Sequence, residues 1–242
     1  MTNKILVIQF RTDKSLIHER QCILSGCGLP KSQFRFVNVL NSKTRIPKTK
    51  ELDNYKATIL GGSGQVNISD WSDKIKSKVL RVTPLLKEVV KKDKLTLGIC
   101  FGHQLLAYIL GGTIEDNPNQ AETGTFQIHL NNNAKLQPIF KGLPTVFYAV
   151  LGHKNSVTRL PKKAMTLAKS EKCNIESYKI KNNIYCVQFH PELNKAGMRF
   201  RLNLFPNYAN NKNIDEILKD YKPTPFATKL LNNFTKLITS NL

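Results

Sequence analysis

The stretch Gly98-Ile99-Cys100-Phe101-Gly102-His103 constrains the fold of this chain more than any other part of it. A short apolar run, Leu95-Thr96-Leu97, precedes it and is typical of a buried strand. The apolar run 104–110 follows and indicates a buried helix, which Gly111-Gly112 should end, because glycine is common just past a helix terminus. Cys100 therefore lies between a strand and a helix, with a glycine two residues away on each side.

This spacing is the glycine-x-nucleophile-x-glycine elbow, here with cysteine as the central residue. The turn has to be sharp, and the flanking residues have to be small so that the backbones can pass closely. The central side chain is then held above the edge of the sheet. A cysteine at the start of a helix also experiences the positive end of the helix dipole, which favours the reactive thiolate. We therefore expect Cys100 to be a nucleophile.

The first half of the chain alternates between strand and helix patterns. The strands expected before the elbow cover 4–10, 34–40 and 55–60, and the helices cover 15–27, 71 to about 82, and a further stretch from Thr83. Ser69 or Asp70 should cap the second helix, and Thr83 with Pro84 should begin the third. This order predicts an α/β fold with a doubly wound, mostly parallel sheet.

Ligands of such sheets bind beyond the carboxyl ends of the strands. The glycine-rich turn Gly61-Gly62-Ser63-Gly64 follows the third expected strand at such an end, so it should face the same site as Cys100. The turn lacks the Lys-Ser/Thr ending of a phosphate-binding loop. A close approach to another ligand and a bare tight turn both remain open for it.

After Gly112 the pattern changes to short strands separated by turns, which predicts an antiparallel extension of the sheet. These strands are expected at 125–130, 146–150, 165–169, 175–180 and 184–188. We find no repeat or linker and expect a single domain, 1–242. Its segment 194–225 is a polar insertion that we leave unassigned, and 226–240 forms a C-terminal helix.

The formal net charge of +20 has two readings. It could mark a nucleic acid or an acidic partner, or it could reflect the heavy use of lysine and asparagine throughout the chain. The basic residues are spread evenly, without an arginine-rich arm or a nucleic-acid-binding module. We therefore favour the second reading and do not expect a nucleic-acid partner.

The cysteines are odd in number and scattered, which argues against a disulfide framework and against a zinc site. They are Cys22, Cys27, Cys100, Cys173 and Cys186. No metal ion is expected. The chain has no apolar run of membrane-spanning length and no signal-peptide core at its start, so we expect a cytoplasmic protein without a membrane partner.

A cysteine nucleophile needs a base, usually histidine, and the histidine needs an orienting group. His190 ends an expected strand and is followed by Pro191-Glu192. Residues i and i+2 of an extended segment point to the same side, so the Glu192 carboxylate can fix the tautomer of His190. Among the other histidines, His18 is expected to face solvent and His103 to be structural. For the oxyanion, the amide of Phe101 and a glycine amide of the 61–62 turn are the expected donors.

Three motifs together resemble the class I glutamine amidotransferases: Gly-Ile-Cys-Phe-Gly-His-Gln, the upstream Gly-Gly turn, and Val-Gln-Phe-His-Pro-Glu. They occur in that family's order, and the resemblance covers about residues 4–193. It implies a flavodoxin-like fold, a Cys100–His190–Glu192 triad, a γ-glutamyl thioester on Cys100, release of ammonia, and no cofactor. It also implies that Gly62 and Phe101 are the oxyanion donors. The glutamine contacts that it implies are Gln104, Gly152, His153 and Asn155.

The sequence departs from the family pattern at two places. The upstream turn is Gly-Gly-Ser-Gly, where the family commonly has Gly-Gly-Pro-Gly. The family's His-Gly-Asp-Ser-Val is here His153-Lys154-Asn155-Ser156-Val157, which loses a carboxylate and gains a cation.

Three functions remain open from the sequence. The first is a glutamine amidotransferase or glutaminase, similar to the amidotransferase half of GMP synthase, that supplies ammonia to a separate acceptor (synthetase) subunit. The second is a γ-glutamyl peptidase or hydrolase acting on glutathione-like substrates. The third is a non-catalytic binding or regulatory protein on the same scaffold. The presence of all three triad residues favours the two enzymes.

Overall fold

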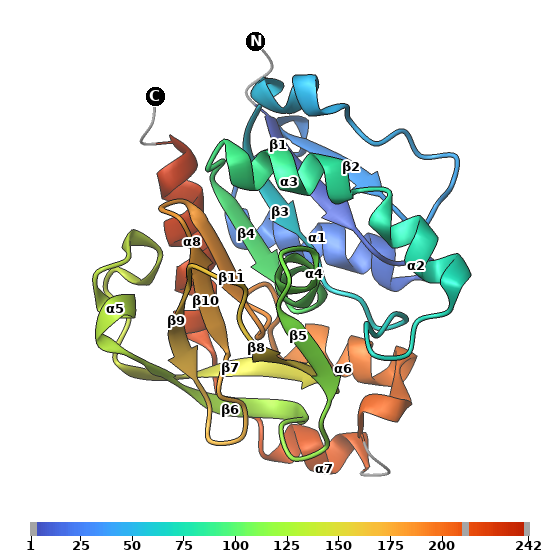
Figure 1. The fold of residues 1–242 in the computed structure, drawn as a ribbon. Helices are drawn as coiled ribbons and strands as arrows, with labels where there is room; N and C mark the ends of the chain where they lie inside the picture. Colours follow the sequence, from blue (N-terminus) through green and yellow to red (C-terminus); the bar gives the residue numbers. More distant parts are fainter. Residues whose placement is uncertain (1–3, 210–212, 240–242) are drawn as a thin grey trace.

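The computed structural model describes residues 4–209 and 213–239. Its main sheet has the strand order β2-β1-β3-β4-β11-β10-β9-β6-β7, and β5 and β8 form a separate ribbon (Figure 1). The strands of the parallel part are β1 (Lys4–Gln9), β2 (Phe34–Asn38), β3 (Tyr55–Leu60), β4 (Thr96–Ile99) and β11 (Ile184–Val187). The antiparallel part contains β10 (Ser177–Ile180), β9 (Ala164–Lys169), β6 (Glu122–Leu130) and β7 (Val146–His153). The ribbon pairs β5 (Thr113–Asp116) with β8 (Asn155–Arg159).

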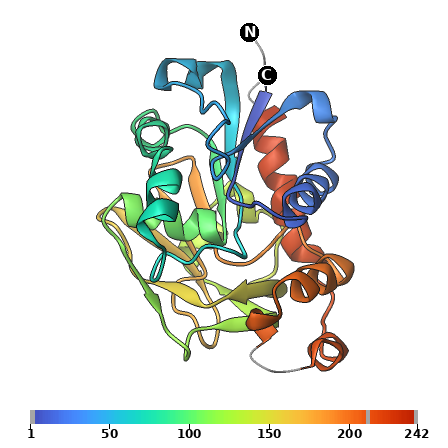
Figure 2. The same ribbon diagram turned by 90° about the vertical axis from the view of Figure 1, so that its right-hand side faces the viewer.

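Helices cover both faces of the parallel strands (Figure 2). The helices are α1 (Ser15–Cys27), α2 (Asp73–Leu80), α3 (Thr83–Lys91), α4 (Phe101–Ile109), α5 (Asn132–Lys135), α6 (Lys195–Leu204), α7 (Ile214–Lys219) and α8 (Pro225–Thr239). Short 3-10 helices occur at Lys31–Gln33, Thr49–Asn54, Pro138–Phe140 and Pro206–Ala209. Helices α1 and α8 pack on one face of the sheet, and α2, α3 and α4 pack on the other. The expected α/β fold with a parallel half and an antiparallel extension is confirmed.

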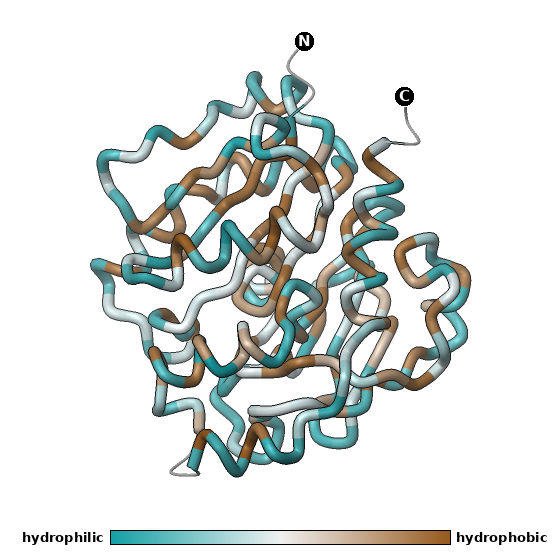
Figure 3. The backbone as a smooth tube through the Cα atoms, turned by 180° about the vertical axis from the view of Figure 1, so that it is seen from behind, coloured by the Kyte–Doolittle hydropathy of each residue, from teal (hydrophilic) through white to brown (hydrophobic). Residues whose placement is uncertain are grey.

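The central strands are apolar on both faces because both faces are covered. In β1, Ile5 and Val7 join the core beneath α1 and α8, whereas Leu6 and Ile8 join the core beneath α3 and α4. In Figure 3 hydrophobic, brown segments run through the interior, and hydrophilic, teal segments are common in the outer turns. None of the helices within the described residues is long and apolar enough to cross a membrane.

Several local expectations differ from the structure. Ser72, rather than Ser69 or Asp70, caps α2 by accepting a hydrogen bond from the Ile75 amide at 3.4 Å. Thr83 is the first residue of α3 and makes no side-chain cap. The sequence analysis did not predict the two strands of the ribbon, β5 and β8. The residues of β5 are half-buried or exposed, so they lack the alternation by which strands are recognised.

The polar segment that the sequence left unassigned contains α6, a 3-10 turn and α7. Met198 and Leu202 of α6 pack with Val150 and Leu193 in a small separate core. This segment therefore lies against β7 and against the turn that follows β11. The C-terminal helix lies where it was expected, as α8, and its last expected residue, 240, falls outside the described residues.

The elbow at Cys100 depends on a close approach between α4 and the neighbouring strands. A Cβ atom on Gly102 would lie 2.5 Å from the carbonyl oxygen of Leu60, and one on Gly98 would lie 3.1 Å from the carbonyl of Gly102. Between these glycines Cys100 adopts φ 49° and ψ −103°, a conformation that side-chain-bearing residues rarely take. The residues that flank the elbow, Gly98 and Gly102, therefore have to be small because backbone atoms lie where their side chains would be.

Replacing Gly102 with alanine should lower the free energy of unfolding by about 1–3 kcal/mol or more, because the new methyl group has to displace backbone. Urea unfolding would measure the change. Gly152→Ala is the matched control, since a Cβ at that position meets nothing within 4 Å. Equal stability of the two variants would contradict the close-approach account.

Candidate active site

Cys100 is held at the carboxyl end of β4 by hydrogen bonds on both sides. Its amide donates to the carbonyl of Val187 at 2.8 Å, and its own carbonyl accepts from the Gln104 amide at 3.1 Å. The residue is 4% exposed. Its backbone therefore joins β11 to the first turn of α4, which fixes the direction of the thiol.

The other four cysteines lie in less reactive surroundings. Burial raises the pKa of Cys22 and Cys27 to about 11 and that of Cys186 to about 12. Burial also raises the pKa of Cys173. All four therefore remain thiols near neutral pH, which leaves Cys100 as the candidate nucleophile.

His190 and Glu192 follow β11, the strand beside β4. The imidazole Nδ1 of His190 lies 2.8 Å from Glu192 Oε1, which is the contact that the i, i+2 spacing predicts. The His190 amide donates to the Val150 carbonyl at 2.8 Å, so β7 holds the turn in place. Val187, the last residue of β11, pairs in register with Ile99, the residue before Cys100. The structure thus brings the three expected triad residues to one edge of the sheet.

The site stabilises the charged form of His190. Burial lowers the pKa of this imidazole, but the charges of Glu192 and Cys100 outweigh burial and raise it to about 9. Burial likewise raises the pKa of Glu192, and the charge of His190 outweighs it and lowers that pKa. An imidazolium at this place favours a neighbouring thiolate and can later give its proton to a leaving group.

The glycine turn after β3 is attached to the elbow and to a buried ion pair. The Gly102 amide donates to the Gly61 carbonyl at 3.1 Å. The Gly62 amide donates to Glu19 Oε1 at 3.0 Å. The same carboxylate oxygen accepts from Arg11 Nε at 2.9 Å, and both side chains are 1% exposed.

The turn needs glycine here because the carboxylate occupies the space where a side chain would lie. A Cβ on Gly61 would be 2.8 Å from the Glu19 oxygens. A Cβ on Gly62 would be 3.0 Å from Arg11 Nη2, 3.1 Å from His190 Cε1 and 3.6 Å from the Cys100 Cβ. Gly62, one of the two expected oxyanion donors, therefore lies beside Cys100 and His190. Its N–H donates a hydrogen bond to Glu19 in this structure. Phe101 supplies the first amide of α4, and such an amide has no preceding helical carbonyl to bond.

A family model for class-I glutamine amidotransferases matches residues 32–205, which include the elbow and the His190–Glu192 turn. This chain belongs to that family. The γ-glutamyl peptidase 3 of Arabidopsis thaliana is 31% identical over 156 residues, covering 62% of this chain and 60% of that protein. A glutamine-hydrolysing GMP synthase subunit of Methanosphaera stadtmanae is 33% identical over 166 residues, covering 66% of this chain and 78% of that protein. The match thus spans about three fifths of the peptidase relative.

Solved structures show the same fold. A glutamine amidotransferase of Thermotoga maritima superposes with a TM-score of 0.78 at 18% identity, covering 98% of both chains. A glutamine amidotransferase of Methylobacillus flagellatus superposes with a TM-score of 0.72 at 18% identity, covering 99% of this chain and 95% of that one.

The expected substrate contacts of this amidotransferase-family chain are mostly buried and bonded to one another. Gln104 Nε2 donates to the Asn155 carbonyl at 2.7 Å and to Gln188 Oε1 at 3.0 Å. The Asn155 amide group bonds both the backbone and the hydroxyl of Ser69. Gly152 is half-buried and lines the cavity beside His190. A role of Gln104, Gly152 and Asn155 in binding glutamine stays a prediction.

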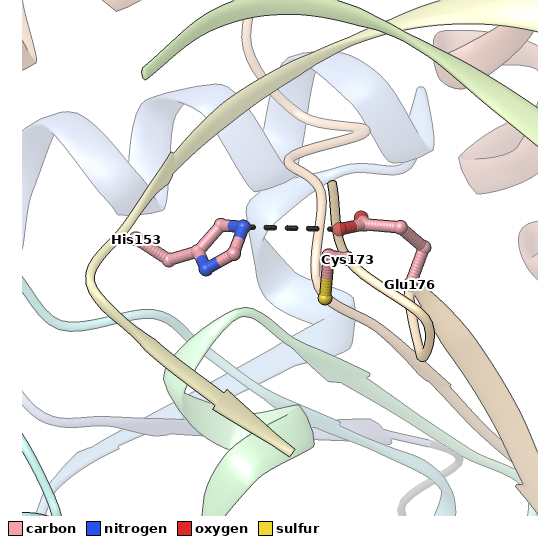
Figure 4. Close-up of side chains that lie close together, drawn as sticks. All are labelled: His153, Cys173 and Glu176. Atoms are coloured by element: carbon pink, nitrogen blue, oxygen red, sulfur yellow. Dashed lines mark ion pairs between the residues drawn. The ribbon is translucent and has the colours of Figure 1, made fainter. Parts of the chain in front are cut away.

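His153 belongs instead to a buried cluster that the sequence analysis missed (Figure 4). Its Nε2 lies 3.3 Å from Glu122 Oε2 and 3.7 Å from Glu176 Oε1, with Cys173 close by. Its Nδ1 lies 3.1 Å from the Asn155 carbonyl. The direct contact between His153 and substrate that the resemblance implies stays a prediction.

Histidine, thiol and carboxylate are ligand types that could hold a metal ion. Burial and the neighbouring charges also shift the pKa values of the two carboxylates of this cluster. Burial, followed by the charge of Glu122, raises the pKa of Glu176 well above its usual value. Burial also raises the pKa of Glu122, but the hydrogen bond and charge of His153 outweigh it and lower that pKa. The two shifts run in opposite directions, so the protonated form is favoured at Glu176 and the charged form at Glu122.

The segment that the sequence left unassigned forms one wall of a cavity beside His190. Its lining includes Arg11, Gly64, Arg201 of α6, and Phe205 and Tyr208 of the following turn. The Phe205 ring lies against Gly64, since a Cβ on that glycine would be 2.4 Å from the ring.

His18, which was expected to face solvent, is only partly exposed and lines a separate surface hollow next to Arg201. It is half-buried, stacks on Phe200, and accepts a hydrogen bond from Arg201 Nε at 3.0 Å. Spacing could not predict this, because the contact joins α1 to α6.

Glu19→Ala should lower the free energy of unfolding by about 3–5 kcal/mol, because it leaves the Arg11 charge buried without its partner. Asp215→Ala is the control, since the ion pair of Asp215 with Arg199 is exposed and should contribute about 0–1 kcal/mol. Chemical denaturation measures both. If Glu19→Ala lowers the free energy of unfolding no more than Asp215→Ala does, the buried ion pair does not stabilise the fold as described.

Proposed function

We propose that this chain hydrolyses γ-glutamyl amide bonds, that of glutamine among them, through a thioester on Cys100. The ammonia released from glutamine would pass to a separate acceptor enzyme. The observation that carries the proposal is the His190–Glu192 pair, with Nδ1 and Oε1 2.8 Å apart, beside a cysteine at φ 49°. Membership of the amidotransferase family supports it.

The reaction would proceed in two halves. The Cys100 thiolate attacks the γ-carbonyl carbon of the substrate, and the negative charge moves to the carbonyl oxygen. The nitrogen of the amide takes the proton held by His190 and leaves as ammonia or an amine, which forms the thioester. His190 then accepts a proton from water, the resulting hydroxide attacks the thioester, and glutamate leaves as the thiolate returns.

The oxyanion would be stabilised by backbone amides in both halves. The Phe101 amide is available as the first of α4. The Gly62 amide has to exchange its hydrogen bond with Glu19 for one with the oxyanion. The same donor would thus be bonded to an anionic oxygen in both the resting and the reacting state.

Cys100→Ala should abolish glutamate release from glutamine, with a loss of roughly 10⁴-fold or more in kcat, because no other group can form the thioester. Purified protein incubated with glutamine, followed by assay of glutamate, measures this loss. Cys22→Ala is the matched control, because Cys22 lies on α1 and its burial raises its pKa to about 11. Turnover by the Cys100 variant would remove the mechanism.

Glu192→Gln should move the alkaline limb of the kcat/KM profile to lower pH. Burial lowers the pKa of His190, and the charge of Glu192 is the first of the influences that outweigh it and raise the pKa to about 9. The wild-type imidazolium is therefore lost as pH rises through about 9, and without the carboxylate it is lost earlier. A pH–rate profile of both proteins tests the shift. An unchanged limb would mean that another group sets the charge of His190.

The second candidate is hydrolysis of γ-glutamyl peptides, in which an amine replaces ammonia as the leaving group. It is favoured by the two arginines, Arg11 and Arg201, that line the cavity beside His190. The peptidase relatives also motivate it. The GMP synthase relative from Methanosphaera stadtmanae motivates a search for a separate synthetase that would receive ammonia. If the protein is not an enzyme, it will hydrolyse neither glutamine nor γ-glutamyl peptides.

A further inference from the structure

Arg201 is a buried cation without an anionic partner. It lies on α6 and is 9% exposed. Its Nε donates to His18 Nδ1 at 3.0 Å, while its Nη2 is buried and has no hydrogen-bond partner. Across residues 4–209 and 213–239, Arg201 takes part in no ion pair.

The neighbours of Arg201 compensate its charge only in part. Burial and the charge of Arg201 lower the pKa of His18 to about 4, so this imidazole is neutral at physiological pH. Burial, followed by the charge of Arg11, lowers the pKa of Arg201 to about 10, although the charges of Glu19 and Glu192 act to raise it. Neither carboxylate forms an ion pair with Arg201: Glu192 pairs with His190 through Oε1 and Glu19 pairs with Arg11. An unpaired buried charge is costly to fold, and the cost is offset when a ligand supplies the missing charge.

The cavity that Arg201 lines also contains His190 and Arg11. In the proposed reaction His190 gives its proton to the departing nitrogen, so the leaving group has to lie on the side of this imidazole. Arg11 Nη2 is on the same side as this imidazole. A Cβ atom on Gly62 would lie 3.0 Å from Arg11 Nη2 and 3.1 Å from His190 Cε1. Two arginines therefore line this side of the cavity, although Arg11 is 1% exposed and already paired with Glu19.

We propose that this cavity is an anion subsite, in which Arg201 binds a carboxylate carried by the leaving amine. The preferred leaving groups are then amino acids or short peptides, whose carboxylate lies close to the departing nitrogen. Guanidinium groups suit this task because they bind carboxylates with two parallel hydrogen bonds. The proposal rests on the proposed function and specifies the amine that the site accepts.

The test compares two substrates that differ in one charge, γ-glutamylglycine and γ-glutamylglycinamide, with glutamine as a third. For the wild-type protein we expect kcat/KM to be about tenfold or more higher for γ-glutamylglycine than for the amide. Arg201→Met should bring this ratio close to one, mainly through KM of the charged substrate. Arg201→Lys should keep an intermediate ratio and shows that the position tolerates substitution.

Arg199→Met is the matched control. Arg199 lies on the same helix, is half-exposed and pairs with Asp215, so its removal should leave the wild-type ratio unchanged. Circular dichroism checks that each variant is folded.

A wild-type ratio near one would overturn the anion subsite. An equal loss on both substrates in Arg201→Met would also overturn it, because Arg201 would then act through Glu192 rather than on the leaving group. Turnover of glutamine without turnover of γ-glutamylglycine would overturn the subsite while the proposed function stands. No turnover of any of the three substrates would mean that the proposed function fails and the subsite with it.

Discussion

The contact between the Gly102 backbone and the Leu60 carbonyl is the constraint on which the site depends. It brings α4 so close to the sheet that a Cβ on Gly102 would clash with backbone and one on Gly98 would be tightly packed. Between these glycines the chain turns with Cys100 at positive φ. The same approach lets the Gly102 amide reach the Gly61 carbonyl. The nucleophile position and the glycine turn are therefore set by one packing contact.

Buried charges form the second level of organisation. On one side of the cysteine, Glu192 keeps the His190 imidazole charged, and on the other, Arg11 and Glu19 hold the Gly62 amide. Each of these carboxylates has its own cation. Arg201 stands out because it lines the cavity beside His190 and forms no ion pair within the described part of the chain, which is the basis of the proposed anion subsite.

The motifs predicted the parts of the site that depend on local geometry. The elbow, the His190–Glu192 contact and the parallel strands follow from short spacings and apolar runs, which are encoded within a few residues. Glu19, Arg11 and Arg201 could not be predicted, because each acts across elements that only the tertiary fold brings together. The segment that supplies Arg201 has a polar sequence whose few apolar residues, such as Met198 and Leu202, pack in a small core of their own. The His153 cluster was missed for the same reason, since its members lie on three different parts of the chain.

The central claim is that Cys100 carries the γ-glutamyl group during turnover. Acid quenching of the protein during reaction with a γ-glutamyl substrate, followed by mass spectrometry of its peptides, tests this claim directly. The account predicts the added mass of one γ-glutamyl group on the peptide that contains Cys100, and none on the peptide that contains Cys22. Turnover without a modified Cys100 peptide, or with the group on another cysteine, would contradict it.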